Sequence, residues 1–194
     1  IEVLPLAARE GKSFDQAAVD AIAENVRFED GNPVELLTGM AGEADLLILG
    51  SRGLHGLRAL GSVSERAAHK ASCSVLVVRE APRPIRQVVL AIDGSAASKK
   101  AVQFLLRSMR PWEDVPDQKP LTVTVAHVMP FLKYPELREA GKAMVEECAN
   151  KLSRAGYLVD QVPRLGNPAD EVLNIAQERK ADLIVTGAKG LGAI

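Results

Sequence analysis

The sequence contains little cysteine and no long apolar run. Cys73 and Cys148 are the only cysteines among 194 residues, too few for a disulfide framework, and neither has the neighbours of a zinc site. No stretch approaches the roughly 20 consecutive apolar residues that a membrane-spanning helix needs. We therefore expect a soluble, cytoplasmic protein without a metal site and without a membrane partner.

The sequence also lacks an excess of charge of either sign. Lys and Arg total 24 and Asp and Glu total 25, so the formal net charge is −1. Such a balance offers no electrostatic surface for nucleic acid or an anionic membrane. Hydrophobic residues make up 47% and charged residues 25%, a mixture typical of globular proteins. At about 150 residues per domain, the length allows one or two domains.

An internal repeat indicates two copies of one domain. Residues 31–33 (Gly-Asn-Pro) are followed by 44–54 (Ala-Asp-Leu-Leu-Ile-Leu-Gly-Ser-Arg-Gly-Leu). The same order recurs as 166–168 and 181–191 (Ala-Asp-Leu-Ile-Val-Thr-Gly-Ala-Lys-Gly-Leu). Two prolines at 82–84 disfavour helix and suit a linker. We expect domains at residues 1–82 and 83–194.

Each copy alternates strand and helix patterns. In the second copy, strands are predicted at 88–92, 122–128, 158–162 and 183–186, and helices at 98–109, 135–155 and 168–180. In the first copy, strands are predicted at 1–4, 26–28, 46–49 and 74–78. Asn167 before Pro168 predicts a helix N-cap, and Asn32 before Pro33 repeats it. Short apolar runs without clean alternation suit strands buried on both faces. The fold class predicted is therefore α/β, doubly wound, with parallel sheets.

Each copy lacks a part that the other has. The first copy has no counterpart of strand 88–92 and its Asp-Gly-Ser turn, and the second has no counterpart of strand 74–78. The sequence also begins with Ile1 and ends at Ile194 within a glycine-rich loop. We expect these residues to be part of a longer chain.

The richest candidate site is the glycine loop at residues 50–65. It follows a predicted strand and precedes a predicted helix, the position of ligands in open parallel sheets. Its glycines allow close backbone approach, and Ser62 with helix N-terminal amides could receive a phosphate. Alternatively, Ser62 and Glu65 form an S-x-x-E capping box and the serine only caps its helix. The loop matches neither the P-loop nor the Rossmann motif.

The second candidate is the turn Asp93-Gly94-Ser95 after strand 88–92. The Asp93 carboxylate could accept a hydrogen bond from a base amine or a ribose hydroxyl. Alternatively, Asp93 or Ser95 is the N-cap of the following helix. Both interpretations stay open from the sequence alone.

Together these segments resemble the universal stress protein family. They are Val-Leu-Ala-Ile-Asp-Gly-Ser (89–95), the Gly-Asn-Pro helix starts, Ala-Asp-Leu-Leu-Ile-Leu-Gly-Ser-Arg-Gly (44–53), Gly-Ser-Val-Ser (61–64) and Ser-Val-Leu-Val-Val-Arg (74–79). The resemblance covers nearly the whole chain, twice, in the family's order. It implies a tandem protein whose copies each form a five-stranded parallel sheet of order 3-2-1-4-5, like the adenine nucleotide alpha hydrolases. It also implies that the copies pair through their last strands as a pseudo-dimer and allows a further homodimer.

The resemblance further implies ATP, alone or with Mg²⁺, as the ligand. ATP-binding members carry the pattern Gly, two residues, Gly, nine residues, Gly-Ser/Thr. Gly50, Gly53, Gly61 and Ser62 match it, but only seven residues separate Gly53 from Gly61. Either the loop is short, which displaces the phosphate site, or two residues are absent from the sequence.

Carried over residue by residue, the resemblance implies two nucleotide sites. The first copy's site comprises Val3, Leu49, Gly50, Gly53, Gly61, Ser62, Val63 and Ser64. The second copy's site comprises Ala91, Ile92, Asp93, Val128, Thr186, Gly187 and Gly190. No residue suggests a catalytic base, and we interpret His127 as structural. The expected function is a nucleotide-binding regulatory module with at most slow hydrolysis. The alternatives are a stress-response scaffold of the same fold with an empty site, and an ATP-using enzyme, for which no nucleophile is evident.

Overall fold

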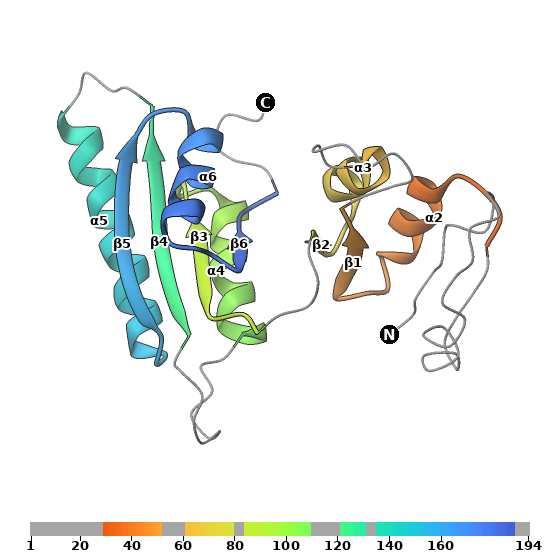
Figure 1. Ribbon diagram of the computed structural model, residues 1–194, viewed down its shortest axis with the longest axis horizontal. Helices are drawn as coiled ribbons and strands as arrows, with labels where there is room; N and C mark the ends of the chain where they lie inside the picture. The colour runs from red at the N-terminus through yellow and green to blue at the C-terminus, as the bar shows by residue number, and fades with distance from the viewer. Residues whose placement is uncertain (1–28, 52–60, 80–83, 110–120, 131–134, 189–194) are drawn as a thin grey trace. The chain divides into compact units, whose positions relative to one another are not determined.

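The computed structural model describes residues 29–51, 61–79, 84–109, 121–130 and 135–188. The chain divides into two compact units, Ile1–Ala81 and Pro82–Ile194. Among the described residues, no helix is both long and apolar enough to span a bilayer. Each unit has its own parallel sheet (Figure 1).

The second unit is built on a four-stranded parallel sheet of order β5-β4-β3-β6. Its strands are β3 (Gln87–Ala91), β4 (Thr122–Met129), β5 (Leu158–Leu165) and β6 (Leu183–Val185). Its helices are α4 (Ala96–Ser108), α5 (Pro135–Arg154) and α6 (Pro168–Glu178). Figure 1 shows α4 and α5 behind the sheet and α6 in front of it.

The side chains of β3 alternate between the two faces of the sheet, which explains why helices cover both faces. Val88 and Leu90 belong to the core cluster that contains α4 and α5 side chains such as Leu105 and Leu152. Val89 points to the other face and packs with Ile175 of α6. Because both faces of the central strand are covered, all of its middle residues are apolar, as expected for a parallel sheet.

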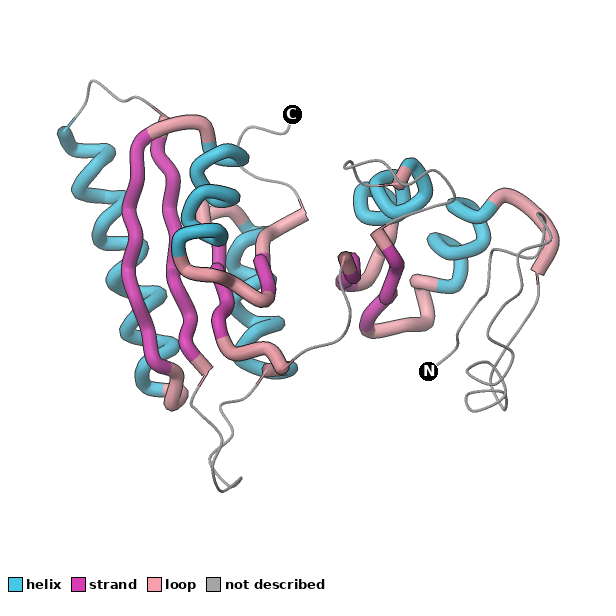
Figure 2. Tube along the Cα trace, in the orientation of Figure 1, coloured by secondary structure: helices cyan, strands magenta, loops and turns pink. Residues whose placement is uncertain are grey.

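The first unit contains α2 (Pro33–Met40), β1 (Leu46–Gly50), α3 (Ser62–Lys70) and β2 (Ser74–Val78). β1 and β2 pair in parallel, with Leu46 opposite Ser74 and Gly50 opposite Val78. Both helices pack on one face of this pair, where Leu37, Leu49 and Ala67 form a small core (Figure 2).

The class predicted from the sequence is confirmed, since both units are α/β with parallel strands. In the second unit, the order β5-β4-β3-β6 corresponds to strands 3-2-1-4 of the expected order. In the first unit, β1 and β2 pair in parallel, as expected for strands 4 and 5. A complete five-stranded sheet in one copy remains a prediction. The strands predicted at 1–4 and 26–28 lie outside the described residues.

Several boundaries differ from the predicted ones for identifiable reasons. α4 begins at Ala96 rather than 98 because Ser95 is its N-cap, with the side chain accepting from the Ser98 amide. β5 continues to Leu165 rather than 162, through Pro163. A proline is tolerated there because β5 is an edge strand among the described residues, with a partner strand on one side only.

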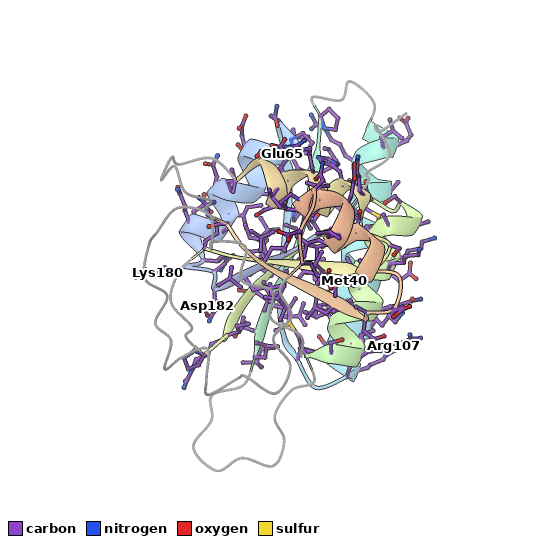
Figure 3. The ribbon with its side chains drawn as sticks, turned by 90° about the vertical axis from the view of Figure 1, so that its right-hand side faces the viewer. Met40, Glu65, Arg107, Lys180 and Asp182 are labelled. Atoms are coloured by element: carbon purple, nitrogen blue, oxygen red, sulfur yellow. The ribbon has the colours of Figure 1, made fainter. Side chains whose placement is uncertain are left out.

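The turn between α6 and β6 is tied to the start of the neighbouring strand β3. Lys180 has the left-handed φ of 49° that ends a helix, and Asp182 follows it (Figure 3). The Asp182 Oδ2 atom accepts hydrogen bonds from the amides of Arg86 and Gln87, each at 2.9 Å. The Asp182 amide donates to the Gln87 carbonyl at 2.8 Å. One aspartate therefore holds the start of β3 against the start of β6.

Cys148 is part of the second unit's core, and we expect its thiol to be inert. Burial raises the pKa of the Cys148 thiol to about 11. Two pKa units lower the thiolate fraction at about pH 8 roughly 100-fold, and the thiolate is the reactive form. In a Cys73→Ser variant, a disulfide reagent should label Cys148 only after denaturant is added. Rapid labelling of the folded variant would contradict this burial.

Ion pairs join α6 and its C-cap residue to β5. Arg164 of β5 donates to Glu178 at 2.9 Å and is also paired with Glu171 at 3.3 Å. Arg179 is paired with Asp160 at 3.1 Å. These side chains are exposed or half-buried, so each pair contributes little to stability but sets how α6 lies along the edge strand.

We expect the Arg164–Glu178 ion pair to have a measurable effect on the pKa of Glu178. The hydrogen bond from Arg164 lowers the pKa of the Glu178 carboxyl below its ordinary value. The contribution of Glu178 to stability is therefore present above its unfolded pKa and is lost as the pH falls through the lowered one. An NMR titration of the Glu178 carboxyl should show this lowering, and Arg164→Gln should remove most of it, since the charge of Arg179 also lowers this pKa. High salt should shrink the shift, because exposed charges are screened.

Candidate functional site

The carboxyl ends of β3 and β6 form the switch point of the second sheet. The chain leaves β3 towards β4 on one side, whereas β6 lies on the other side of β3. Leu90 and Val185 are opposite each other, so Asp93 and Gly187 follow neighbouring strands at the same edge. In open parallel sheets this crevice is where ligands bind.

The Asp93 turn is shaped by its own side chains. The Asp93 Oδ1 atom accepts from the Ser95 amide at 2.9 Å, and Gly94 adopts a φ of 81°. Ser95 caps α4 by accepting from the Ser98 amide at 3.1 Å. The capping interpretation is thus confirmed for Ser95, while the half-buried Asp93 organises the turn that precedes the helix.

Gly187 is required for close packing of β6 on α4. A Cβ atom on this glycine would lie 2.7 Å from the Ala97 carbonyl carbon and 2.8 Å from the Ser98 amide nitrogen. Both are backbone atoms, which cannot move without moving the helix. The packing against α4 therefore requires glycine at position 187, independently of any ligand.

The other residues expected in the second copy's site lie at the same edge. Ala91 ends β3, and Ile92 is buried, its amide donating to the Ala126 carbonyl at 2.9 Å. Val128 is a buried residue near the end of β4. Thr186 is exposed and donates to the Gly187 carbonyl at 3.3 Å. Gly190 lies outside the described residues.

In the first unit, hydrogen bonds bring the two ends of the glycine loop together. The Ser64 hydroxyl donates to the Gly50 carbonyl at 2.7 Å. The Gly61 amide donates to the Ser51 carbonyl at 2.9 Å, and the Ser51 amide donates to the Val78 carbonyl at 2.8 Å. The start of α3 is thereby fixed at the carboxyl end of β1.

The predicted Ser62–Glu65 capping box is wrong. The N-cap of α3 is Gly61, which makes no side-chain capping hydrogen bond, and Ser62 is the first helical residue. Ser62 is therefore exposed at the helix start and does not cap it. Because the N-cap is a glycine, no N-cap side chain covers the first amides of α3.

The remaining first-copy residues have other contacts or lie outside the described residues. Leu49 is buried in the small core, and Val63 packs against that core. Val3 and Gly53 fall outside the described residues. Within the described part of the chain, no group of three or more His, Cys, Asp or Glu side chains could hold a metal ion.

One contact of this edge was missed by sequence reasoning. The His127 Nδ1 atom lies 2.8 Å from the carbonyl oxygen of Ile92, the residue before Asp93. His127 was interpreted as structural, and nothing in its local sequence indicates a partner 35 positions away.

The comparisons with known proteins agree with this architecture. The model of the universal stress protein family matches residues 3–79 and 84–194. Universal stress protein Slr1230 of Synechocystis sp. is 25% identical over 181 residues, which are 92% of this chain and 58% of that protein. A universal stress protein of Thermus aquaticus, from the QAH/OAS sulfhydrylase 3′ region, is 31% identical over 125 residues, covering 56% of this chain and 81% of that protein.

A solved structure shares the fold. The universal stress protein from Archaeoglobus fulgidus DSM 4304 superposes with a TM-score of 0.60 at 19% identity, covering 87% of this chain and 62% of that one. The chain thus spans about three fifths of the length of two of these relatives. With the family model matched twice along its length, the chain belongs to the universal stress protein family.

Proposed function

We propose that the chain is a tandem universal stress protein that binds an adenine nucleotide, ATP with or without Mg²⁺, at the carboxyl edge of one or both sheets. Its role is regulatory, with at most slow hydrolysis. The proposal includes a cytoplasmic location and pairing of the two copies through their last strands, with a further homodimer allowed.

The observation that carries the proposal is the arrangement at the start of α3. Gly50, Gly61 and Ser62 match the family's ATP motif, and hydrogen bonds from Ser64 and Gly61 hold the two flanks of the loop together. Helix N-terminal amides attract phosphate through their unpaired N–H groups and the helix dipole. The N-cap of α3, Gly61, has no side chain that could cap these amides.

The second unit supports the base-binding half of such a site. Asp93 and Thr186 follow adjacent strands at the switch point, where a base or ribose would lie between them. A carboxylate there can accept from an exocyclic amine or a ribose hydroxyl. The second unit has no described counterpart of α3, so its phosphate-binding half is not part of this proposal.

The alternative is a scaffold of the same fold with an empty site. The seven-residue spacing between Gly53 and Gly61 favours it, because the family's ATP motif has nine. The close packing of Gly187 on α4 also gives that glycine a role without a ligand.

Calorimetric titration of the purified chain with ATP tests the proposal, after mass spectrometry of any ligand released on denaturation. Saturable binding or co-purified nucleotide supports it. Its stoichiometry then distinguishes one site from two. Absence of both favours the scaffold.

Ser62→Asp should separate phosphate binding from helix stability. A carboxylate in the first turn of α3 is favourable for the helix dipole but repels a phosphate. We expect ATP affinity to fall at least about tenfold, while thermal stability stays equal or rises. His69→Asp introduces the same charge at the other end of α3 and should leave affinity unchanged. Equal loss in both variants would contradict a phosphate site at Ser62.

A further inference from the structure

We propose that His127 is a positioning residue that sets the Asp93 turn from the neighbouring strand. The inference rests on the proposed function, because it assigns to the turn the role of presenting Asp93 to the nucleotide. His127 itself lies beneath the turn and acts through Ile92.

The hydrogen bond from His127 has only one direction. A carbonyl oxygen accepts and cannot donate, so the Nδ1 atom carries the proton that lies between it and the Ile92 carbonyl at 2.8 Å. The Ile92 amide in turn donates to Ala126 at 2.9 Å. Both backbone polar groups of Ile92 are therefore held by consecutive residues of β4. This fixes the peptide from which Asp93 projects.

Helix α5 packs against the His127 ring and restricts its position. A Cβ on Gly141 would lie 2.9 Å from the ring Cδ2 atom, 3.0 Å from Nε2 and 2.9 Å from the Met129 sulfur. Glycine within a helix costs stability relative to alanine, and here it makes room for the ring. The ring is held between the carbonyl that it binds and the helix backbone against which it packs.

The same helix also contacts the turn directly. The Met144 sulfur lies 3.1 Å from where a Cβ on Gly94 would be, and Gly94 has the left-handed φ of 81°. Met144 is one helical turn beyond Gly141, so both lie on the same face of α5. The turn is thus set from β4 through His127 and from α5 through Met144.

Such support lowers the entropy that binding must overcome. A loop already held in its bound conformation loses less freedom when the ligand arrives. Without the His127 bond, the Ile92 peptide can rotate and the Asp93 carboxylate samples other orientations. We therefore expect loss of the bond to weaken binding without a matching loss of global stability.

Two substitutions at position 127 separate the hydrogen bond from packing. His127→Leu fills much of the same space without a donor. His127→Asn retains a donor, because its Nδ2 atom stands two bonds beyond Cβ, as Nδ1 does in histidine. Gly141→Ala is the third variant. It retains His127, but the new methyl group of Ala occupies the space of the imidazole ring and displaces it.

The experiment measures amide hydrogen exchange at residues 93–95 and ATP affinity in the full chain. All variants are made both with Ser62 intact and in the Ser62→Asp background, in which the phosphate site proposed for the first unit is weakened. We expect His127→Leu and Gly141→Ala to speed exchange about tenfold and to weaken ATP binding about fivefold or more. His127→Asn should restore both to within about threefold of the parent.

Each outcome decides a separate point. Unchanged amide exchange at residues 93–95 in His127→Leu overturns the inference. Equal weakening of ATP binding by His127→Leu and His127→Asn also overturns it. Faster exchange with unchanged ATP affinity overturns the link from the turn to binding. If no variant, the parent with an intact Ser62 included, binds ATP, the proposed function fails. In that case, amide exchange at residues 93–95 still decides whether His127 stabilises the Asp93 turn.

Discussion

Gly187→Val should destabilise the second unit by about 3 kcal/mol, at the upper end of what overpacking usually costs. The Cβ atom alone would stand 2.7 Å from the carbonyl carbon of Ala97, and valine adds two further methyl groups. Because the contact is with helix backbone, relief requires α4 to move away from β6. That movement also displaces Ser95 and the Asp93 turn, so ligand binding by this unit should be lost as well.

Denaturant unfolding, followed by one probe in each unit, measures this effect. Gly50→Val is the matched control, because Gly50 holds the corresponding position in the first copy and, apart from its chain neighbours, no heavy atom of the described residues lies within 4 Å of its Cβ position. Valine is favoured in strands, so the control should be neutral or mildly stabilising. Equal destabilisation by both substitutions would show that the contact with α4 is not the cause.

Asp182→Ala should cost the second unit about 2 kcal/mol, within the range for hydrogen bonds to a charged group. The carboxylate accepts from two consecutive amides, those of Arg86 and Gln87. Its removal leaves the half-buried Gln87 amide without this acceptor at the point where β3 begins. We expect the midpoint of denaturant unfolding to fall and exchange of the Gln87 amide to accelerate.

The first copy again offers a matched control. Asp45 occupies the equivalent place before β1 and has no hydrogen-bond partner within the described part of the chain. Asp45→Ala should therefore change stability by less than about 0.5 kcal/mol, as exposed substitutions usually do. Asp182→Asn should fall between the two, because a neutral amide oxygen accepts more weakly than a carboxylate. A loss at Asp45 as large as that at Asp182 would contradict this explanation.

Features specified by neighbouring residues were predicted correctly. The Asn-Pro pairs indicated helix starts, and the Asn32 and Asn167 side chains do accept from the amides of Val34 and Ala169. An N-cap is decided within four residues, so a local pattern contains the necessary information. The four strands of the second unit were likewise evident from short apolar runs bounded by turns.

Features that depend on distant contacts were not predicted. The S-x-x-E pattern indicated a cap at Ser62, but α3 starts one residue earlier because Gly61 and Ser64 are bound to the end of β1. The partner of His127 is contributed by another strand. In the sequence, Asp182 is recognisable only as part of the repeat. Its contact with residue 86 spans 96 positions, which no local pattern can reveal.

The sheet order of the second unit has a consequence for how it acquires its structure. Among the described strands of this unit, the central strand β3 comes first along the chain, but its neighbour β6 comes last. Pairing these strands closes a loop of nearly the whole unit, and such non-local contacts slow folding. During synthesis, β3, β4 and β5 can associate early, while one edge of β3 waits for β6 to leave the ribosome. We expect this exposed edge to be the point at which the nascent chain is most prone to aggregate.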